Sequence, residues 1–433
     1  MAKKTVADEK PADAAVEVIQ HLGPGLITGA ADDDPSGIAT YSQAGAQFGL
    51  GMLWTMVLCM PLMIAIQSIA ARIGCVTGKG LAGNIKTIFP PWLLGGLVLL
   101  LLVANVINIA ADVAAMGAAA VLVLPGVDFH VYVVGFGVLS LVLQLFLPYS
   151  KYVRILKWLT LALLAYVAVI FTVKIDWREV ALRTVMPQLA INKESLTMLV
   201  AILGTTISPY LFFWQSSEEV EELEREKETP LKDTRGKAAE ARKQLRRIGV
   251  DTVAGMFFSN LIAFFVILTT AVTLNAHHVT NITSAAQAAE ALRPIAGQFA
   301  FLIFSLGIIG TGLLAIPVLA GSAAYAVAET RGWDSGLSHK VLEAKEFYAI
   351  ITFAVLGGVA LSFAPIDPMK ALVWSAVING VAAVPIMAVT MVVATSKKIM
   401  SHYTATPSQR VFGWLATAAM GAASIGMVVL MLV

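Results

Sequence analysis

The sequence predicts an all-α integral membrane protein with eleven transmembrane helices, built as two inverted repeats of five helices with the first and sixth helices broken. Of its 433 residues, 58% are hydrophobic and 13% are charged, whereas soluble domains carry about 25% charged residues. A single aqueous core cannot hide this much apolar surface, so lipid is expected to cover much of it. In addition, proline interrupts the first and the sixth apolar stretch, which are corresponding members of the two halves.

Eleven stretches reach or approach the roughly 20 apolar residues that a spanning helix needs. Their centres lie near Ala30, Met60, Val103, Leu139, Leu163, Gly204, Ile262, Gly310, Leu356, Val381 and Met420. The ninth stretch is short and rich in glycine. Residues 1–20 are polar and lack the apolar core of a signal peptide, which indicates a cytoplasmic tail.

The loops predict the orientation, because cytoplasmic loops carry an excess of Lys and Arg. With the N-terminus inside, 24 of the 30 basic residues fall in inside segments. An odd number of spans then places the C-terminus outside. We expect the transporter domain to cover 21–433, with repeats at about 21–175 and 194–395 and an extra helix at about 411–432. The charged segment 218–249 is expected to form a solvated cytoplasmic helix.

The first span carries the most informative residues, because three consecutive aspartates lie within it. Asp32, Asp33 and Asp34 would cost on the order of 7–10 kcal/mol together if charged and facing lipid. Pro35 removes a donor and disfavours helical geometry at Asp34. If these acids instead lay in a surface loop, only about 13 residues would remain before Gly51, too few to cross. We therefore expect a break beside the acids, lining a polar cavity or a cation site.

The sixth span has a matching defect at Gly204–Tyr210, where small polar residues lead into Pro209. Alone, this could be an ordinary proline kink. Paired interruptions at corresponding positions, however, indicate a midplane substrate site in an inverted-repeat transporter, the fold of sodium-coupled amino-acid transporters. Carbonyl oxygens near Ser36, Ile207 and Ser208 are candidate ligands there.

Polar residues in two further spans are expected to face the same cavity. Asn105, Asn108 and Asp112 share one helical face of the third span. Hydrogen bonding between helices would explain the asparagines, but it explains a buried carboxylate poorly. Asn379 in the tenth span could line the cavity or tie helices together.

These side chains predict a site for a hard divalent cation. Carboxylates, carbonyls and hydroxyls suit Mg²⁺, Ca²⁺ or Mn²⁺, whereas iron, cobalt or copper sites usually include imidazole or sulfur. We expect no Cys near the inferred site, and no His lies in a predicted span core. Three acids oppose an organic anion as substrate. The sequence contains no glycine-rich phosphate loop or basic phosphate clamp, which argues against an enzyme.

The motifs Gly23-Pro24-Gly25 and Asp34-Pro35-Ser36-Gly37 resemble the first helix of the Nramp divalent-metal transporters, where the broken motif reads Asp-Pro-Gly-Asn. Ser208-Pro209-Tyr210 resembles the Met-Pro-His motif of their sixth helix. The resemblance extends weakly through the tenth helix and implies Asp34 as a metal ligand, with Asp112 at the position of a family aspartate.

The departures from the family pattern all favour a harder metal ion and transport without proton coupling. Gly37 replaces the metal-binding asparagine, Ser208 replaces the methionine, Tyr210 replaces one histidine and Gln215 replaces a second. The family's acidic position three residues after Asp112 is Ala115 here, and the ninth helix, from Ala349 to Phe363, has none of the family's basic residues. Losing the thioether removes a preference for soft metals. Losing the histidines removes proton acceptors.

The pattern thus resembles the prokaryotic Nramp-related magnesium transporters, which implies uptake of Mg²⁺, and also Mn²⁺, by alternating access without obligatory proton coupling. We expect Asp34 to bind the ion, Asp33 to add charge and Asp112 to hold its water, with Asp32, Gly37, Asn108, Tyr210 and Asn379 lining the cavity. The expected partners are a hydrated divalent cation and the bilayer, with no nucleic acid, no cofactor and a monomeric chain. The alternative is a proton-coupled Mn²⁺ or Fe²⁺ importer.

Overall fold

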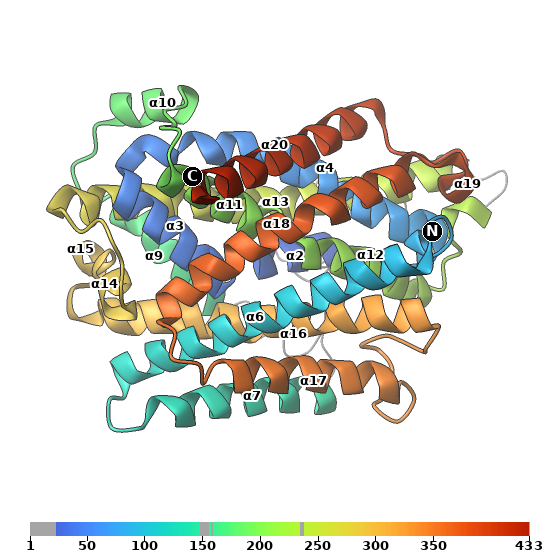
Figure 1. Ribbon diagram of the computed structural model, residues 1–433, viewed down its shortest axis with the longest axis horizontal. Coiled ribbons are helices and arrows are strands. Elements are labelled where there is room, and N and C mark those ends of the chain that lie inside the picture. The colour runs from blue at the N-terminus through green and yellow to red at the C-terminus, as the bar shows by residue number, and fades with distance from the viewer. Residues whose placement is uncertain (1–22, 148–155, 157–158, 234–237, 433) are drawn as a thin grey trace, which may run out of the picture.

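The computed structural model describes residues 23–147, 156, 159–233 and 238–432, so the predicted tail at 1–20 lies outside the described residues. Every regular element in the described part of the chain is helical. Most helices run side by side along the long axis of the molecule (Figure 1). The helices are α2 (Pro24–Asp32), α3 (Pro35–Phe48), α4 (Trp54–Thr77), α5 (Leu81–Ile85), α6 (Pro91–Val123), α7 (Phe129–Phe146), α9 (Leu164–Val169), α10 (Trp177–Val185), α11 (Lys193–Thr206), α12 (Pro209–Glu226), α13 (Ala238–Thr273), α14 (Ala285–Glu290), α15 (Arg293–Ala296), α16 (Ala300–Arg331), α17 (Lys345–Leu361), α18 (Pro368–Thr395), α19 (Lys397–Met400) and α20 (Pro407–Leu432).

Within the described residues, eight stretches are long and apolar enough to cross a membrane: α4, α6, α7, α11 with α12, α13, α16, α18 and α20. Each contains one of the predicted span centres. Large apolar side chains such as Phe146, Phe258 and Leu432 are exposed on them, as expected of surfaces that contact lipid. The molecule is therefore an all-helical, multi-pass membrane protein.

The other three predicted spans are not among these eight stretches, each for a different reason. The first is divided into α2, with 9 residues, and α3, with 14 residues. The fifth contains α9, and part of that stretch lies outside the described residues. The ninth is α17, which has 17 residues. The expectation of eleven spans therefore stays a prediction.

The connecting segments gather at the two ends of the bundle. In Figure 1, α10, α14 and α15 lie at one end, and α19 lies at the opposite end. The sequence assigns the first three to the outside and α19 to the inside. The arrangement is thus consistent with alternating passes through a membrane.

The broken helices occupy the interior. From Pro35 to Ala46 every residue of α3 is buried, and α11 is buried from Met198 to Thr206. α13 lies along α2 and α3, whereas α18 lies along α11 and α6. The two breaks are thereby enclosed by helices from both halves of the chain.

The expectation of a single solvated helix over 218–249 is wrong. α12 ends at Glu226, α13 begins at Ala238, and a short 3-10 turn lies between them. Glu218 and Glu219 are 5% and 2% exposed. The charge pattern could not reveal this burial, because the first part of α12 lies inside the helical bundle and Glu218 and Glu219 are buried with it.

Candidate metal-ion site

The first helix breaks where the three aspartates meet Pro35. Asp32 ends α2 and Pro35 begins α3, so the predicted interruption is confirmed. Asp34 is the N-cap of α3, and its Oδ1 accepts the Gly37 N–H at 2.7 Å and the Ser36 hydroxyl at 2.6 Å. Aspartate is a preferred N-cap and proline is favoured at the first helical position. The local sequence therefore fixes both the break and the orientation of Asp34.

The sixth helix breaks in the same way. α11 ends at Thr206, Ile207 and Ser208 leave the helical conformation, and Pro209 begins α12. The Ser208 hydroxyl lies 2.7 Å from the Gly204 carbonyl and 2.9 Å from the Thr205 carbonyl, so it donates within its own helix. Both α2 and α11 end at the breaks, and carbonyl groups at a helix C-terminus carry partial negative charge. The breaks are thus favourable places for a cation.

Five side chains from four helices converge beside the first break. Asp34 Oδ2 accepts hydrogen bonds from Asn108 Nδ2 at 3.0 Å and from the Tyr210 hydroxyl at 3.3 Å. Asn108 Nδ2 also lies 3.4 Å from Asp112 Oδ2, and Asn108 Oδ1 accepts Asn379 Nδ2 at 3.2 Å. All five side chains are at most 1% exposed. We call Asp34, Asn108, Asp112, Tyr210 and Asn379 the Asp34 cluster.

Two oxygen atoms of the Asp34 cluster are buried without a hydrogen-bond partner among the described residues. They are Asp112 Oδ1 and Asn379 Oδ1. An unpaired buried oxygen costs about 1–3 kcal/mol, more if it is charged. A cation, or water held by a cation, would satisfy both. The cluster thus has the chemistry of a hard-ion site.

The other two aspartates turn toward a different helix. The hydroxyl of Ser259, on α13, lies 2.5 Å from Asp32 Oδ2 and 3.1 Å from Asp33 Oδ1. Sequence reasoning missed Ser259, although the pair Ser259-Asn260 interrupts a long apolar stretch and could have marked it. Asp32 and Asp33 are 0% and 6% exposed. Their observed hydrogen bonds therefore go to Ser259 and not to the side chains that contact Asp34.

The predicted ligands are therefore not brought together as one group. Among the described residues, no three His, Cys, Asp or Glu side chains converge as a metal site. The Ser36 and Ser208 hydroxyls are used within their own turns. The side-chain candidates that remain are the carboxylates of Asp34 and Asp112, which Asn108 joins, beside the backbone carbonyls at the two breaks. This arrangement fits an ion that keeps part of its water shell better than one coordinated wholly by protein.

The two remaining predicted positions have local roles. Asn105 donates to the Leu319 carbonyl and to Ser322 on α16, so it joins helices. A Cβ atom on Gly37 would lie 3.1 Å from Thr205 Oγ1. Glycine here leaves room between the two breaks, where a larger side chain would have to displace Thr205.

A cavity of about 170 Å³ opens one helical turn from the Asp34 cluster. Ile38 of α3 and Ala115 of α6 line it, four and three residues beyond Asp34 and Asp112. Other walls come from α14, α16 and α18, and Asp367 lies among them. Since a water molecule occupies about 30 Å³ in the liquid, the cavity has room for an ion with several waters. It leads toward the end where α14 lies.

Comparison with known proteins shows to which family this chain belongs. Residues 25–430 match the family model described as natural resistance-associated macrophage protein-like, or Nramp. A divalent metal cation transporter, MntH, of Acidiphilium cryptum is 27% identical over 376 residues, covering 84% of this chain and 80% of that protein. MntH of Caldanaerobacter subterraneus is 24% identical over 415 residues, covering 92% and 90%.

Solved structures share the fold. The manganese transporter of Eremococcus coleocola superimposes with a TM-score of 0.71 at 17% identity, covering 97% of this chain and 88% of that one. Mhp1, a nucleobase-cation-symport-1 family transporter, superimposes with a TM-score of 0.54 at 12% identity, covering 94% and 92%. With the family match spanning nearly the whole described chain, this protein belongs to the Nramp family and is a divalent metal cation transporter, not an enzyme.

Proposed function

We propose that this transporter carries Mg²⁺, and also Mn²⁺, into the cell as partly hydrated ions, without obligatory coupling to protons. One observation carries the proposal: among the described residues, the side chains that donate hydrogen bonds to Asp34 are a serine, an asparagine and a tyrosine, none of which offers sulfur or imidazole. Oxygen ligands suit Mg²⁺ and Mn²⁺, whereas soft metals favour thioether, thiolate or imidazole.

Each residue of the Asp34 cluster has a role in this proposal. Asp34 binds the ion directly or through one water. Asp112 and Asn379 accept hydrogen bonds from the ion's water. Asn108 rotates its amide to present an oxygen when the ion enters, and Tyr210 bounds the cavity. Carbonyl oxygens of Ser36, Ile207 and Ser208 complete the shell.

Asp32 and Asp33 contribute charge from farther away. Ser259 is their one hydrogen-bond donor within the described residues, so the two carboxylates attract a cation toward the break without surrounding it. Mg²⁺ dehydrates reluctantly and usually binds through one or two carboxylates. A site with two nearby carboxylates, amide oxygens and room for water meets that requirement.

Transport proceeds by alternating access in the bacterial cell membrane. The 21–175 and 194–395 repeats rearrange around the two breaks, with the N-terminus inside, the C-terminus outside and the chain acting as a monomer. An inside-negative potential contributes about 2.3 kcal/mol per charge per 100 mV, so a divalent cation needs no coupled ion to enter.

A second candidate is a proton-coupled importer of Mn²⁺ or Fe²⁺. It is favoured by the names of the relatives, which are called manganese or divalent metal cation transporters. It would share the Asp34 cluster and differ in selectivity and coupling. The serine at position 208 and the tyrosine at 210 argue against it.

The proposal is tested by measuring Mg²⁺ uptake into proteoliposomes held at an inside-negative potential. We expect uptake by the parent protein, reduced by roughly a hundredfold or more in Asp34→Ala, because the change removes the central charge. Asp128→Ala is the matched control, since Asp128 also caps a helix but is exposed at the start of α7. Absence of Mg²⁺ uptake by the parent, with Mn²⁺ uptake present, would favour the second candidate.

A further inference from the structure

A groove of about 630 Å³ runs along the outer face of α13, beside α4. Val250, Val253, Phe257 and Phe258 line it, and each of these apolar side chains is between 43% and 63% exposed. Both helices belong to stretches that are long and apolar enough to cross a membrane. The groove therefore faces lipid, and it shares no lining residue with the Asp34 cluster.

Small residues keep this groove open. Gly249 and Ala254 of α13 and Ser68 of α4 are among its lining residues. A Cβ atom added to Gly249 would meet no atom within 4 Å, whereas one added to Gly255 would collide with the Gly25 carbonyl. The face of α13 that carries Gly255 is thus filled by α2, and the face that carries Gly249 is left to the surroundings of the protein.

Two basic side chains stand at one end of the groove. Arg246 lines it, and Lys243 lies three residues earlier, on the same helical face. Both are exposed, and within the described residues neither forms a hydrogen bond or an ion pair. Their positive charges are therefore available to a partner from outside the chain.

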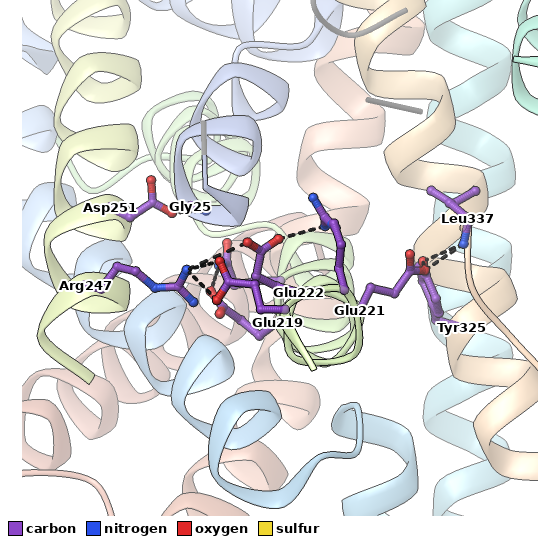
Figure 2. Close-up of polar contacts among 11 residues, drawn as sticks. Gly25, Glu219, Glu221, Glu222, Arg247, Asp251, Tyr325 and Leu337 are labelled. Atoms are coloured by element: carbon purple, nitrogen blue, oxygen red, sulfur yellow. Dashed lines mark hydrogen bonds and ion pairs between the residues drawn. The ribbon is translucent and has the colours of Figure 1, made fainter. Parts of the chain in front are cut away.

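The charged residues that follow these two bases on α13 are directed at other helices. Arg247 forms ion pairs with Glu226 at 3.2 Å and with Glu222 at 3.7 Å, both on α12. Asp251 Oδ2 accepts the Gly25 N–H of α2 at 2.7 Å. Figure 2 shows Arg247 directed at α12 and the Asp251 carboxylate directed at Gly25. Neither residue compensates the two bases at the groove.

The length of the groove matches one leaflet of a bilayer. Phe258 follows Arg246 by twelve residues on α13, which corresponds to about 18 Å along the helix axis. The hydrocarbon part of one leaflet is about 15 Å thick, half of a core of roughly 30 Å. Basic residues at one end of an apolar groove of this length fit an amphiphile with an anionic head, because a soluble anion would leave the apolar part empty.

We propose that this groove binds an anionic phospholipid from the leaflet next to Arg246. The phosphate lies at Lys243 and Arg246, because basic residues near a membrane surface attract anionic head groups. One acyl chain lies along Val250 and Phe257, where it covers exposed apolar surface. Its end reaches the residue before Ser259, whose hydroxyl contacts the aspartates of the first break. The inference does not depend on which metal ion the protein carries.

The site is tested by native mass spectrometry of the full chain in detergent, titrated with phosphatidylglycerol or with phosphatidylcholine carrying the same acyl chains. The parent protein should bind phosphatidylglycerol more tightly than phosphatidylcholine. Arg246→Gln and Lys243→Gln should each weaken phosphatidylglycerol binding by roughly fivefold, the contribution of one basic residue near a membrane surface. Lys398→Gln is the matched control, because Lys398 is also exposed but does not line the groove; it should leave binding unchanged.

Gly249→Leu provides an independent variant, because it fills the groove without changing its charge. The new side chain meets open space, so the protein should still fold, and binding of both lipids should weaken. Gly95→Leu, in α6, also meets nothing within 4 Å but lies outside the groove. It should leave the binding of both lipids as in the parent.

Three other results would overturn the proposal. Equal affinity of the parent for the two lipids, or equal binding by Arg246→Gln and Lys398→Gln, would show that the groove takes bulk lipid without selecting its charge. Displacement of the lipid by glycerol phosphate, the head group without acyl chains, would assign the bases to a soluble anion. A dimer without bound lipid would assign the groove to a second copy of the chain. Should Arg246→Gln not fold, Lys243→Gln and Gly249→Leu decide the question.

Discussion

At the scale of single residues, Asp34 has two tasks at once. Its Oδ1 caps α3 through Ser36 and Gly37, and its Oδ2 faces Asn108 and Tyr210. The cap holds the carboxylate in one orientation, so under the proposed function the oxygen that would bind the ion is placed before the ion arrives. Preorganisation of this kind lowers the cost of binding.

Asn108 is the residue that joins the cluster, because it contacts Asp34, Asp112 and Asn379. Asn108→Leu should therefore reduce Mg²⁺ affinity by at least tenfold, since it removes the donor from two carboxylates and the acceptor from an amide. The measurement is Mg²⁺ binding by calorimetry. Asn105→Leu, one turn earlier on α6, removes the hydrogen bonds that the described structure gives Asn105, to Leu319 and Ser322. It should lower thermal stability while keeping affinity. Equal losses of affinity in both variants would contradict this role.

Ser208 is the position that should set the preference between metals. Ser208→Met adds a thioether at the second break, which favours softer ions, so the ratio of Mn²⁺ to Mg²⁺ uptake should rise severalfold. Ser208→Leu has nearly the same volume without sulfur and should leave the ratio near that of the parent. Competition between the two ions in proteoliposomes measures it. Identical ratios in the methionine and leucine variants would exclude Ser208 as a determinant.

The sequence predicted the residue types of the site better than their directions. Asp34, Asn108 and Asp112 could be inferred because charged and amide side chains in an apolar helix must face a polar interior. That Asp32 and Asp33 turn to Ser259 could not, because the partner lies more than 200 residues away. Nor could the return of the Ser208 hydroxyl to its own helix be inferred, since local geometry decides it.

At the scale of elements, the two breaks were predictable because proline acts locally. Pro35 and Pro209 each begin a new helix, as their missing N–H requires. The bounds of the helices within 218–249 were not predictable, because Glu219 is buried where α12 packs against α4, a helix far away in the sequence. The charge pattern alone therefore overestimated the solvent exposure of residues 218–249.

α2 packs closely against α13 at Gly25, Gly29 and Gly255, and this contact allows a test at the scale of elements. Gly29→Ala should lower the melting temperature, because the new Cβ would lie 2.4 Å from the Gly255 carbonyl and force the helices apart. Gly95→Ala, in α6, meets nothing within 4 Å and should be neutral or stabilising, since alanine is favoured in a helix by about 1 kcal/mol. Thermal unfolding in detergent distinguishes them, and equal shifts would show that the contact does not need glycine.

At the scale of the whole molecule, the orientation is open to direct measurement. Asn281 is exposed near α14, and Lys398 is exposed in α19. In intact cells, an impermeant thiol reagent should label Asn281→Cys but not Lys398→Cys, because the basic residues place α19 inside. Labelling of Lys398→Cys alone would invert the orientation, and labelling of both would contradict the expected crossings between them.

The central claim, uncoupled entry of Mg²⁺ through the Asp34 cluster, is tested most directly by reading a Mg²⁺-sensitive dye and a pH dye together in proteoliposomes. The membrane potential is set, and Asp34→Ala serves as the inactive control. We predict Mg²⁺ entry that increases with inside-negative potential, no movement of protons with it, and loss of both voltage dependence and entry in the variant. Mn²⁺ entry accompanied by acidification, with no entry of Mg²⁺, would contradict the account and assign the chain to proton-coupled transport.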